Sequence, residues 1–195
     1  MHIILMTAII ALVPTNMELA EDALEMSLME LPAQLSAYGV EDVCVEMTGE
    51  HSGDWFIKQT VVSVLHESGF TVLDRDVSDG SGIVLRIRPM ELVVEYGDVS
   101  RPWIVGSKRV ERIAKCELMV TLLDHAGEIL MSVRTSGMEQ DVVSWSDAEI
   151  LGGSSEWDWL SGELPENRGG GILEPIVVTG VVASLVYLFY SSRAE

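Results

Sequence analysis

The residues of this sequence that could carry chemistry are few and scattered. It has four histidines, and none stands in a metal-binding spacing such as H-E-x-x-H: His2, His51, His66 and His125. The chain contains no G-x-S-x-G nucleophile motif, no P-loop and no dinucleotide-binding fingerprint. The carboxylates between residues 74 and 80 could attract calcium, but the loop lacks the downstream glutamate of an EF-hand. The sequence therefore predicts no catalytic residue, no cofactor and no metal site, with the histidines His66 and His125 at the surface.

The two cysteines, Cys44 and Cys116, both fall in apolar stretches that read as strands. In an exported protein they could form a disulfide if their strands are neighbours with Cα atoms within about 7 Å. As small buried hydrophobic side chains they need no partner. The second interpretation is favoured, and the first stays open.

Charge excludes one class of partner and singles out one segment. The chain has 12 Lys and Arg against 31 Asp and Glu, a formal net charge of −19, which disfavours a nucleic-acid partner. Seven of the 12 basic residues lie between positions 86 and 115: Arg86, Arg88, Arg101, Lys108, Arg109, Arg112 and Lys115. They form either a solvated strand face that offsets nearby acids or a docking patch for an acidic partner.

The docking interpretation assigns partner binding to five of these side chains: Arg101, Lys108, Arg109, Arg112 and Lys115. An acidic protein surface or an anionic envelope polymer would suit such a patch. On this interpretation, replacing Arg109 and Arg112 with glutamate weakens partner capture without unfolding the domain.

The first half of the chain alternates helices and strands. Residues 17–38 form a helix with four leucines on one face, split near Pro32 and ended by Gly39: Leu24, Leu28, Leu31 and Leu35. A strand at 43–47, a helix at 55–68 and a strand at 70–73 follow. The order is therefore α, β, α, β.

The second half is mainly β-structure. A strand over 83–96 is interrupted at Pro89, which places it at an edge or gives it a bulge, and 97–106 reads as a loop. Residues 114–122 alternate and form a hairpin with 129–133. Beyond these, four apolar residues pack on the domain or lie at a membrane interface: Trp145, Trp157, Trp159 and Leu160. The fold class is α+β, with a mixed, mostly antiparallel sheet and helices on one face.

The C-terminal segment, 172–192, reads as a transmembrane helix after a glycine linker at 167–171. Its uncharged stretch begins at Ile176 and ends in an aromatic group, with the anchor carried by Ile176, Val177, Val178, Leu185, Val186, Tyr187, Leu188, Phe189 and Tyr190. The alternative is a buried element at the end of the domain. Arg193 beyond it places a tail, 193–195, in the cytoplasm and the domain outside.

The N-terminal segment, 1–20, resembles a signal peptide with an apolar core from Ile3 to Val13 and its best cleavage site near Ala20. No Lys or Arg precedes Lys58, so the usual basic start is missing. The alternative is an uncleaved apolar helix. The extracytoplasmic domain is then expected over residues 21–166.

Two motifs suggest a kinship. The segment Phe56–Arg75, F-I-K-Q-T-V-V-S-V-L-H-E-S-G-F-T-V-L-D-R, runs from a helix into a strand closed by Asp-Arg, and Leu122–Leu130 matches an L-x-D-x-x-G-E-I-L hairpin. Both resemble periplasmic domains shared by the curli-secretion lipoproteins, the lipoprotein activators of penicillin-binding proteins and the flagellar assembly protein T. The resemblance covers roughly residues 41–138 and implies a non-catalytic envelope domain that binds other proteins.

These features together lead to a functional expectation. The chain is expected to be a single-pass protein of the bacterial inner membrane, with its domain in the periplasm as a scaffold or accessory subunit in secretion, envelope or surface-structure biogenesis. Its expected partners are other envelope proteins and, through the C-terminal helix, the bilayer. The alternatives are a tail-anchored cytosolic adaptor and, supported only by abundant acids, a membrane-tethered hydrolase.

Overall fold

The computed structural model describes residues 13–73, 82–100, 107–153 and 156–165. Its elements in chain order are α1 (Asn16–Leu28), α2 (Leu31–Ala37), β1 (Asp42–Met47), α3 (Asp54–Glu67), β2 (Thr71–Leu73), β3 (Val84–Ser100), β4 (Arg109–Leu123), β5 (Ile129–Ser144), α4 (Trp145–Gly153) and the 3-10 turn η2 (Asp158–Leu160). The folded unit ends at residue 165. All of these elements belong to this unit.

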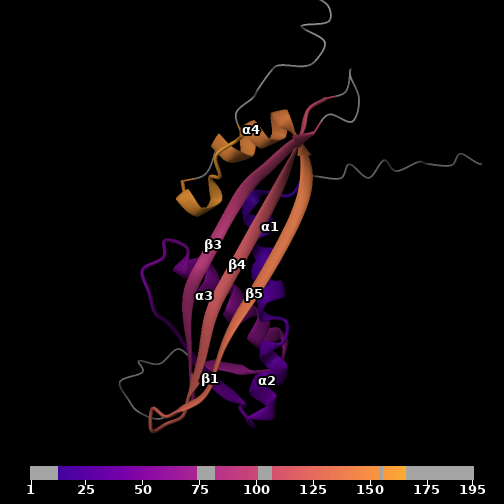
Figure 1. Cartoon of the computed structure of the whole chain (residues 1–195). Coiled ribbons are helices and arrows are strands. Elements are labelled where there is room, and N and C mark those ends of the chain that lie inside the picture. The colour runs from indigo at the N-terminus through magenta and orange to yellow at the C-terminus, as the bar shows by residue number, and fades with distance from the viewer. Residues whose placement is uncertain (1–12, 74–81, 101–106, 154–155, 166–195) are drawn as a thin grey trace, which may run out of the picture. The chain divides into compact units, whose positions relative to one another are not determined.

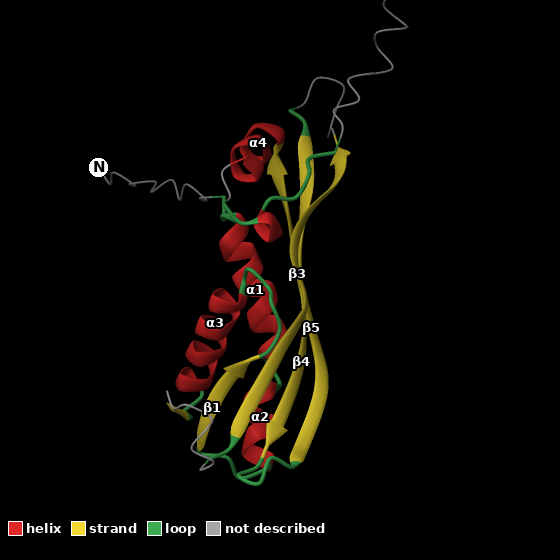
Figure 2. Ribbon diagram, turned by 90° about the vertical axis from the view of Figure 1, so that its left-hand side faces the viewer, coloured by secondary structure: helices red, strands yellow, loops and turns green. Residues whose placement is uncertain are grey.

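The five strands form one mixed sheet in the order β2-β1-β3-β4-β5. The short strands β2 and β1 run parallel to each other, and β1 also runs parallel to β3. The long strands β3, β4 and β5 are antiparallel to their neighbours (Figure 1). Helices α1, α2 and α3 lie on one side of the sheet, as Figure 2 shows. The prediction of an α+β fold with a mixed, mostly antiparallel sheet is confirmed.

The β3 strand is longer than the sequence suggested. Its register with β4 shifts between Pro89 and Glu91, which is the bulge that the proline predicted. The prediction that a loop begins at residue 97 is wrong, because Val99 pairs with Val110 and Ser100 with Arg109. A second register shift between Tyr96 and Val99 accommodates the two intervening residues, so the strand resumes after them.

The core lies between the helices and the sheet. The four leucines of the predicted helical face are at most 1% exposed and lie on α1 and α2: Leu24, Leu28, Leu31 and Leu35. Pro32 sits in the first turn of α2, where its missing N–H costs no helical hydrogen bond, so the predicted split is confirmed. On β4, alternate residues from Ala114 to Leu122 are at most 2% exposed. Both predicted periodicities therefore mark buried faces.

Helix α1 packs closely on β5 at Gly137. A Cβ atom at this position would lie 2.0 Å from the carbonyl oxygen of Ala23 and 2.7 Å from the backbone nitrogen of Ser27. Backbone atoms cannot move aside as a flexible side chain would, so the contact requires glycine.

Replacing Gly137 with alanine is therefore expected to lower the free energy of unfolding by about 1–3 kcal/mol, because α1 must move off the sheet. Urea denaturation measures the loss. Gly153→Ala is the matched control, since no atom lies within 4 Å of a Cβ there. Equal stability of the two variants would show that α1 does not approach β5 this closely.

The predicted terminal segments fall largely outside the described residues. The apolar run up to residue 12, the glycine linker at 167–171, the anchor at 172–192 and the tail at 193–195 are among them. So are Arg101 and the carboxylate-rich loop from 74 to 80. No helix within the described ranges is long and apolar enough to cross a bilayer.

The start of the folded unit lies earlier than the expected domain boundary at residue 21. Helix α1 begins at Asn16, and Thr15 and Glu18 form a capping box, with each side chain accepting a hydrogen bond from the other residue's backbone N–H. Asn16, Leu19 and Ala20 are buried. Residues 16–20, which the sequence analysis placed in the signal-peptide-like segment, are therefore part of α1, and three of them lie in the core.

Candidate functional site

The residues of the predicted basic patch do not all lie on the same face of the sheet. Arg112 has no exposed surface and lies on the core face of β4, in line with Ala114 and Cys116. Its assignment as a partner-binding residue is therefore wrong, because a buried guanidinium cannot contact a partner. Replacing both Arg109 and Arg112 with glutamate is therefore expected to destabilise the fold, so this double variant cannot test partner capture alone.

The other basic residues of the segment are mainly engaged with neighbours within the domain. Lys115 Nζ lies 2.5 Å from Glu95 Oε2, and this hydrogen bond raises the pKa of Lys115. Arg86 Nε lies 2.8 Å from Glu46 Oε2. Lys108 Nζ stands 5.4 Å from the centre of the Trp145 ring, and Arg109 is exposed. This pairing favours the interpretation of a strand face that offsets nearby acids.

Arg112 is the centre of a buried polar network. Its Nε and Nη2 atoms donate to the two carboxylate oxygens of Asp141 on β5, at 2.9 and 2.5 Å. Nη1 donates to Asn16 Oδ1 at 2.8 Å, and Nη2 also donates to the carbonyl of Pro14 at 2.9 Å. This two-pronged pairing suits the planar guanidinium and holds the start of α1 against the sheet.

Asn16 extends the network to the last described part of the chain. Its Nδ2 atom donates to the carbonyl of Leu160 at 2.7 Å, and lies 3.1 Å from Tyr96 Oη and 3.4 Å from the carbonyl of Leu151. These bonds tie α1 to β3, α4 and η2. We call Asn16, Tyr96, Arg112 and Asp141 the clamp. The clamp holds residue 14 and residue 160 at the same end of the domain.

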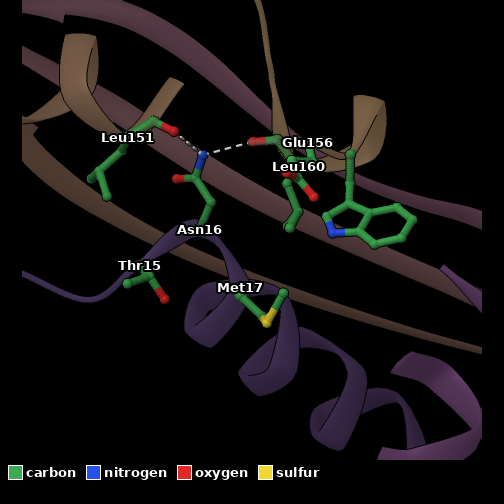
Figure 3. A pocket seen from close by; sticks show the side chains of 7 residues that line it. Thr15, Asn16, Met17, Leu151, Glu156 and Leu160 are labelled. Atoms are coloured by element: carbon green, nitrogen blue, oxygen red, sulfur yellow. Dashed lines mark hydrogen bonds between the residues drawn. The ribbon is translucent and has the colours of Figure 1, made fainter. Parts of the chain in front are cut away.

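A cavity of about 280 Å³ opens beside the clamp (Figure 3). Seven residues line it: Thr15, Asn16, Met17, Leu151, Glu156, Trp157 and Leu160. Figure 3 shows the Asn16 amide directed at the carbonyls of Leu151 and Leu160, so this group is already bonded to the chain. Glu156 is the one ionisable side chain of the lining. The walls of the cavity are therefore formed by the start of α1, the end of α4 and the segment around η2.

No group of three or more His, Cys, Asp or Glu side chains that could hold a metal ion occurs in the described parts of the chain. His66 and His125 are exposed, as predicted. His51 accepts a hydrogen bond from the Gly53 backbone at 3.0 Å, and its ring centroid lies 6.4 Å from that of Trp159. That histidine therefore stabilises the turn before α3.

The tryptophans after β5 pack on the domain. Trp159 and Leu160 are 5% and 4% exposed, and the Trp159 ring lies 5.3 Å from Phe56 of α3. Trp157 contacts Trp55 at 5.7 Å, and Trp145 packs beside a small cluster that includes Val110 and Val143. Of the two predicted placements, packing on the domain is confirmed for Trp159 and Leu160.

The cysteines do not form a disulfide with each other, because β3 lies between β1 and β4 in the sheet. Cys116 is buried and accepts a hydrogen bond from Ser27 Oγ at 3.8 Å. Burial raises the pKa of the Cys116 thiol from 9.0 to about 11.

The folded protein is therefore expected to leave Cys116 unlabelled by a thiol reagent at pH 8, since its reactive thiolate is roughly a thousandth of the population three units below the pKa. Ellman's reagent, followed by peptide mapping, measures this. Labelling in urea provides the control, because unfolding removes the burial. Rapid labelling of Cys116 without urea would contradict its place in the core.

No family model and no curated protein sequence matches the chain. Three solved structures share part of its arrangement: a putative neuraminyllactose-binding hemagglutinin homolog from Helicobacter pylori, a minor lipoprotein from Acinetobacter baumannii and the rare lipoprotein B from Shewanella oneidensis. Their identities are 11%, 10% and 16%, and the alignments cover 54%, 58% and 52% of this chain and 68%, 80% and 68% of theirs. The TM-scores are 0.34, 0.35 and 0.33, a likeness that carries no functional conclusion.

Proposed function

We propose that the protein is a non-catalytic, membrane-anchored envelope protein whose domain faces the periplasm and acts as a scaffold or accessory subunit of an assembly. The observation that carries the proposal is the position of the two described chain ends. The bond from Asn16 to the Leu160 carbonyl, 2.7 Å long, holds them at one end of the domain. The apolar segments that precede and follow the domain in the sequence therefore leave from the same end, which suits a domain held at a membrane surface.

The use of the polar side chains supports a binding role over a catalytic one. The guanidinium of Arg112 and the amide of Asn16 bond to other parts of the domain, so they are occupied in holding segments together. Catalysis needs acid and base groups that reach a substrate in a pocket. The described cavity contributes a single carboxylate, that of Glu156.

The sheet supplies a surface on which another protein could pack. The helices α1 to α3 cover one side of the sheet (Figure 2). On the other side, the outward residues of β4 are a mixture of charged, polar and apolar side chains. Met138 and Val142 on β5 are 52% and 58% exposed. Because β5 is an edge strand of 16 residues, its outer backbone groups could also pair with a partner strand.

Fractionation of bacterial cells that express the full chain tests the proposal. The protein is expected in the membrane pellet and to remain there after alkaline extraction, whereas a variant that ends at residue 165 is expected in the soluble fraction. Protease added to spheroplasts should digest the domain, and protease added to intact cells should not. Recovery of the full chain in the soluble fraction would overturn the membrane anchor.

One observation favours the tail-anchored cytosolic adaptor as a second candidate. Asn16, Leu19 and Ala20 are buried in the domain, so cleavage near Ala20 would remove part of the core, and the N-terminal evidence for export is correspondingly weaker. The same protease experiment separates the two candidates. A domain that resists protease in spheroplasts and is digested only after lysis faces the cytosol.

A further inference from the structure

The two edges of the sheet differ in how well they are protected from pairing with another strand. The strand at one edge, β2, has three residues, whereas β5 at the other edge has 16. Among the described residues, no strand lies beyond β5. β5 contains no proline and no lysine, and its register with β4 is continuous from Met131 to Ser144. Shortness, proline, lysine and bulges are the usual devices that block edge pairing, so β5 lacks the protection that β2 has.

Alternate residues of β5 direct their backbone groups away from the sheet. The backbone N–H of Trp145 donates to the carbonyl of Lys108 at 3.0 Å, and the β4–β5 register repeats this pairing at every second residue back along the strand. Odd-numbered residues of β5 therefore bond to β4, and even-numbered residues present their N–H and C=O groups at the open edge. The even-numbered residues from 130 to 142 are all exposed, so no described element covers this row of donors and acceptors.

Helix α1 runs beneath this edge. The backbone atoms of Ala23 and Ser27 lie against Gly137 of β5, and Figure 1 shows α1 behind the β5 side of the sheet. Asp22 and Met26 each precede one of the two contact residues, and both are exposed. The residue after each contact is a leucine buried in the core. Because one residue turns an α-helix by about 100°, the residue before each contact points the other way, past the edge of the sheet.

The charge beside the open edge is negative. Every charged side chain of α1 is a carboxylate: Glu18, Glu21, Asp22 and Glu25. Glu139 adds another on the helix side of β5, two residues from Gly137. Desolvation and then repulsion from Glu21 and Asp22 raise the pKa of Glu25. Basic side chains of a partner would relieve this repulsion, and the formal net charge of −19 favours their approach.

The outer face of the same edge is partly apolar. Leu130, Met138 and Val142 lie on the side of β5 away from the helices and are 38%, 52% and 58% exposed. Arg134 is the one charged residue of this row, and it is already paired with Glu117 of β4. A strand beside β5 would place its own side chains about 5 Å from this row. Apolar side chains on this face of the added strand, and basic side chains on its other face, would match the edge.

We propose that β5 and α1 together bind an extended segment of a partner protein, in which lysine or arginine alternates with apolar residues, as an additional strand of the sheet. Backbone pairing supplies the affinity, and alternate side chains select the partner. The basic side chains face α1, and the apolar ones cover the exposed row on β5. The inference names the chemistry of the partner and rests on the proposed partner-binding role of the domain.

A synthetic peptide of about nine residues, a usual strand length, in which lysine alternates with valine or threonine, is the probe. It is titrated against the full chain in a non-ionic detergent and followed by fluorescence anisotropy. An extended peptide presents alternate N–H groups at its two edges, so methylating the backbone nitrogen of every lysine, or of every other residue, blocks opposite edges. One methylated peptide is expected to bind about tenfold more weakly than the unmethylated one, and the other nearly as well. No binding of the unmethylated peptide, or equal binding of the two methylated peptides, would overturn the proposal.

Variants of the protein locate the binding on β5. Ser136→Pro removes an N–H group at the open edge and none that bonds to β4, and it is expected to weaken binding about tenfold. Ser136→Ala is the matched control and should bind as the unchanged chain does. Asp22→Asn combined with Glu139→Gln should weaken binding several-fold, whereas Asp42→Asn, an exposed acid on β1, should not. Equal binding by the two Ser136 variants would overturn edge pairing, and equal binding by the two charge variants would overturn the basic partner.

Failure of this inference and failure of the proposed function appear in different measurements. Cell fractionation tests the membrane anchor, whereas the peptide titration uses purified full chain and does not depend on where the domain resides. A chain that stays with the membrane but does not distinguish the methylated peptides overturns the strand pairing alone. A chain that distinguishes them but is recovered in the soluble fraction overturns the anchor and leaves the strand pairing in place. Circular dichroism of each variant, matched to the unchanged chain, ensures that folded proteins are compared.

Discussion

Replacing Arg112 with methionine is expected to lower the free energy of unfolding by about 3 kcal/mol, because a buried guanidinium is removed from an ion pair whose carboxylate, on Asp141, is only partly exposed. Methionine keeps most of the side chain's length but donates no hydrogen bond. The carboxylate of Asp141, the amide oxygen of Asn16 and the carbonyl of Pro14 would each lose a donor that now lies within 2.9 Å. Urea denaturation followed by circular dichroism measures the loss.

Arg109→Met is the matched control, because Arg109 lies three positions earlier on the same strand and is exposed. Its change in stability is expected to stay within about 0.5 kcal/mol. The double variant Arg112→Met with Asp141→Leu should recover part of the loss, since the second replacement removes the unpaired carboxylate. If Arg112→Met is no less stable than Arg109→Met, the clamp does not stabilise the domain.

The burial of Arg112 could have been predicted from the sequence by extending the alternation on β4 towards its start. The alternation on β4 is evident from Ala114 to Leu122, and one further step of two residues reaches position 112. The period-two rule therefore places this arginine on the buried face, and the clustering of charge in the sequence obscures that signal. Its partner Asp141 could not be identified in the same way, because the register between β4 and β5 decides which residue faces it.

The helices were predictable because their signals are local. The leucine spacing of α1 and α2 and the position of Pro32 depend only on neighbours within a few residues. The approach of α1 to Gly137 and the bond from Asn16 to Leu160 join residues far apart in sequence. No periodicity within one segment reports such contacts, so the clamp was found only in the structure.

The start of α1 did carry a local signal that the apolar run before it concealed. Thr15 and Glu18 have the spacing of a capping box, which marks a helix N-terminus. An apolar run followed by small residues also resembles a signal peptide, and that interpretation placed the boundary five residues too far into the folded unit. The position of Leu19 in the core, 2% exposed, distinguishes the two.

A chain that begins at residue 21 is therefore not expected to fold. It lacks Leu19, and losing a buried leucine side chain costs about 2–5 kcal/mol. It also lacks the Thr15 cap, worth about 1 kcal/mol, and leaves Arg112 without the two acceptors that Asn16 and Pro14 provide. These losses together approach the whole stability of a typical domain, about 5–15 kcal/mol. Circular dichroism and urea denaturation in one detergent compare this chain with the full-length protein.

The control is a chain that begins at Val13, which keeps the capping box and the clamp and is expected to unfold at the same urea concentration as the full chain. The comparison also constrains any processing of the protein in the cell. A protease that cut after Ala20 would remove the capping residue and part of the core, so the N-terminus of folded protein purified from cells is expected at or before Val13. Recovery of a stable, folded chain that starts at Glu21 would contradict both the role of the clamp and this limit on cleavage.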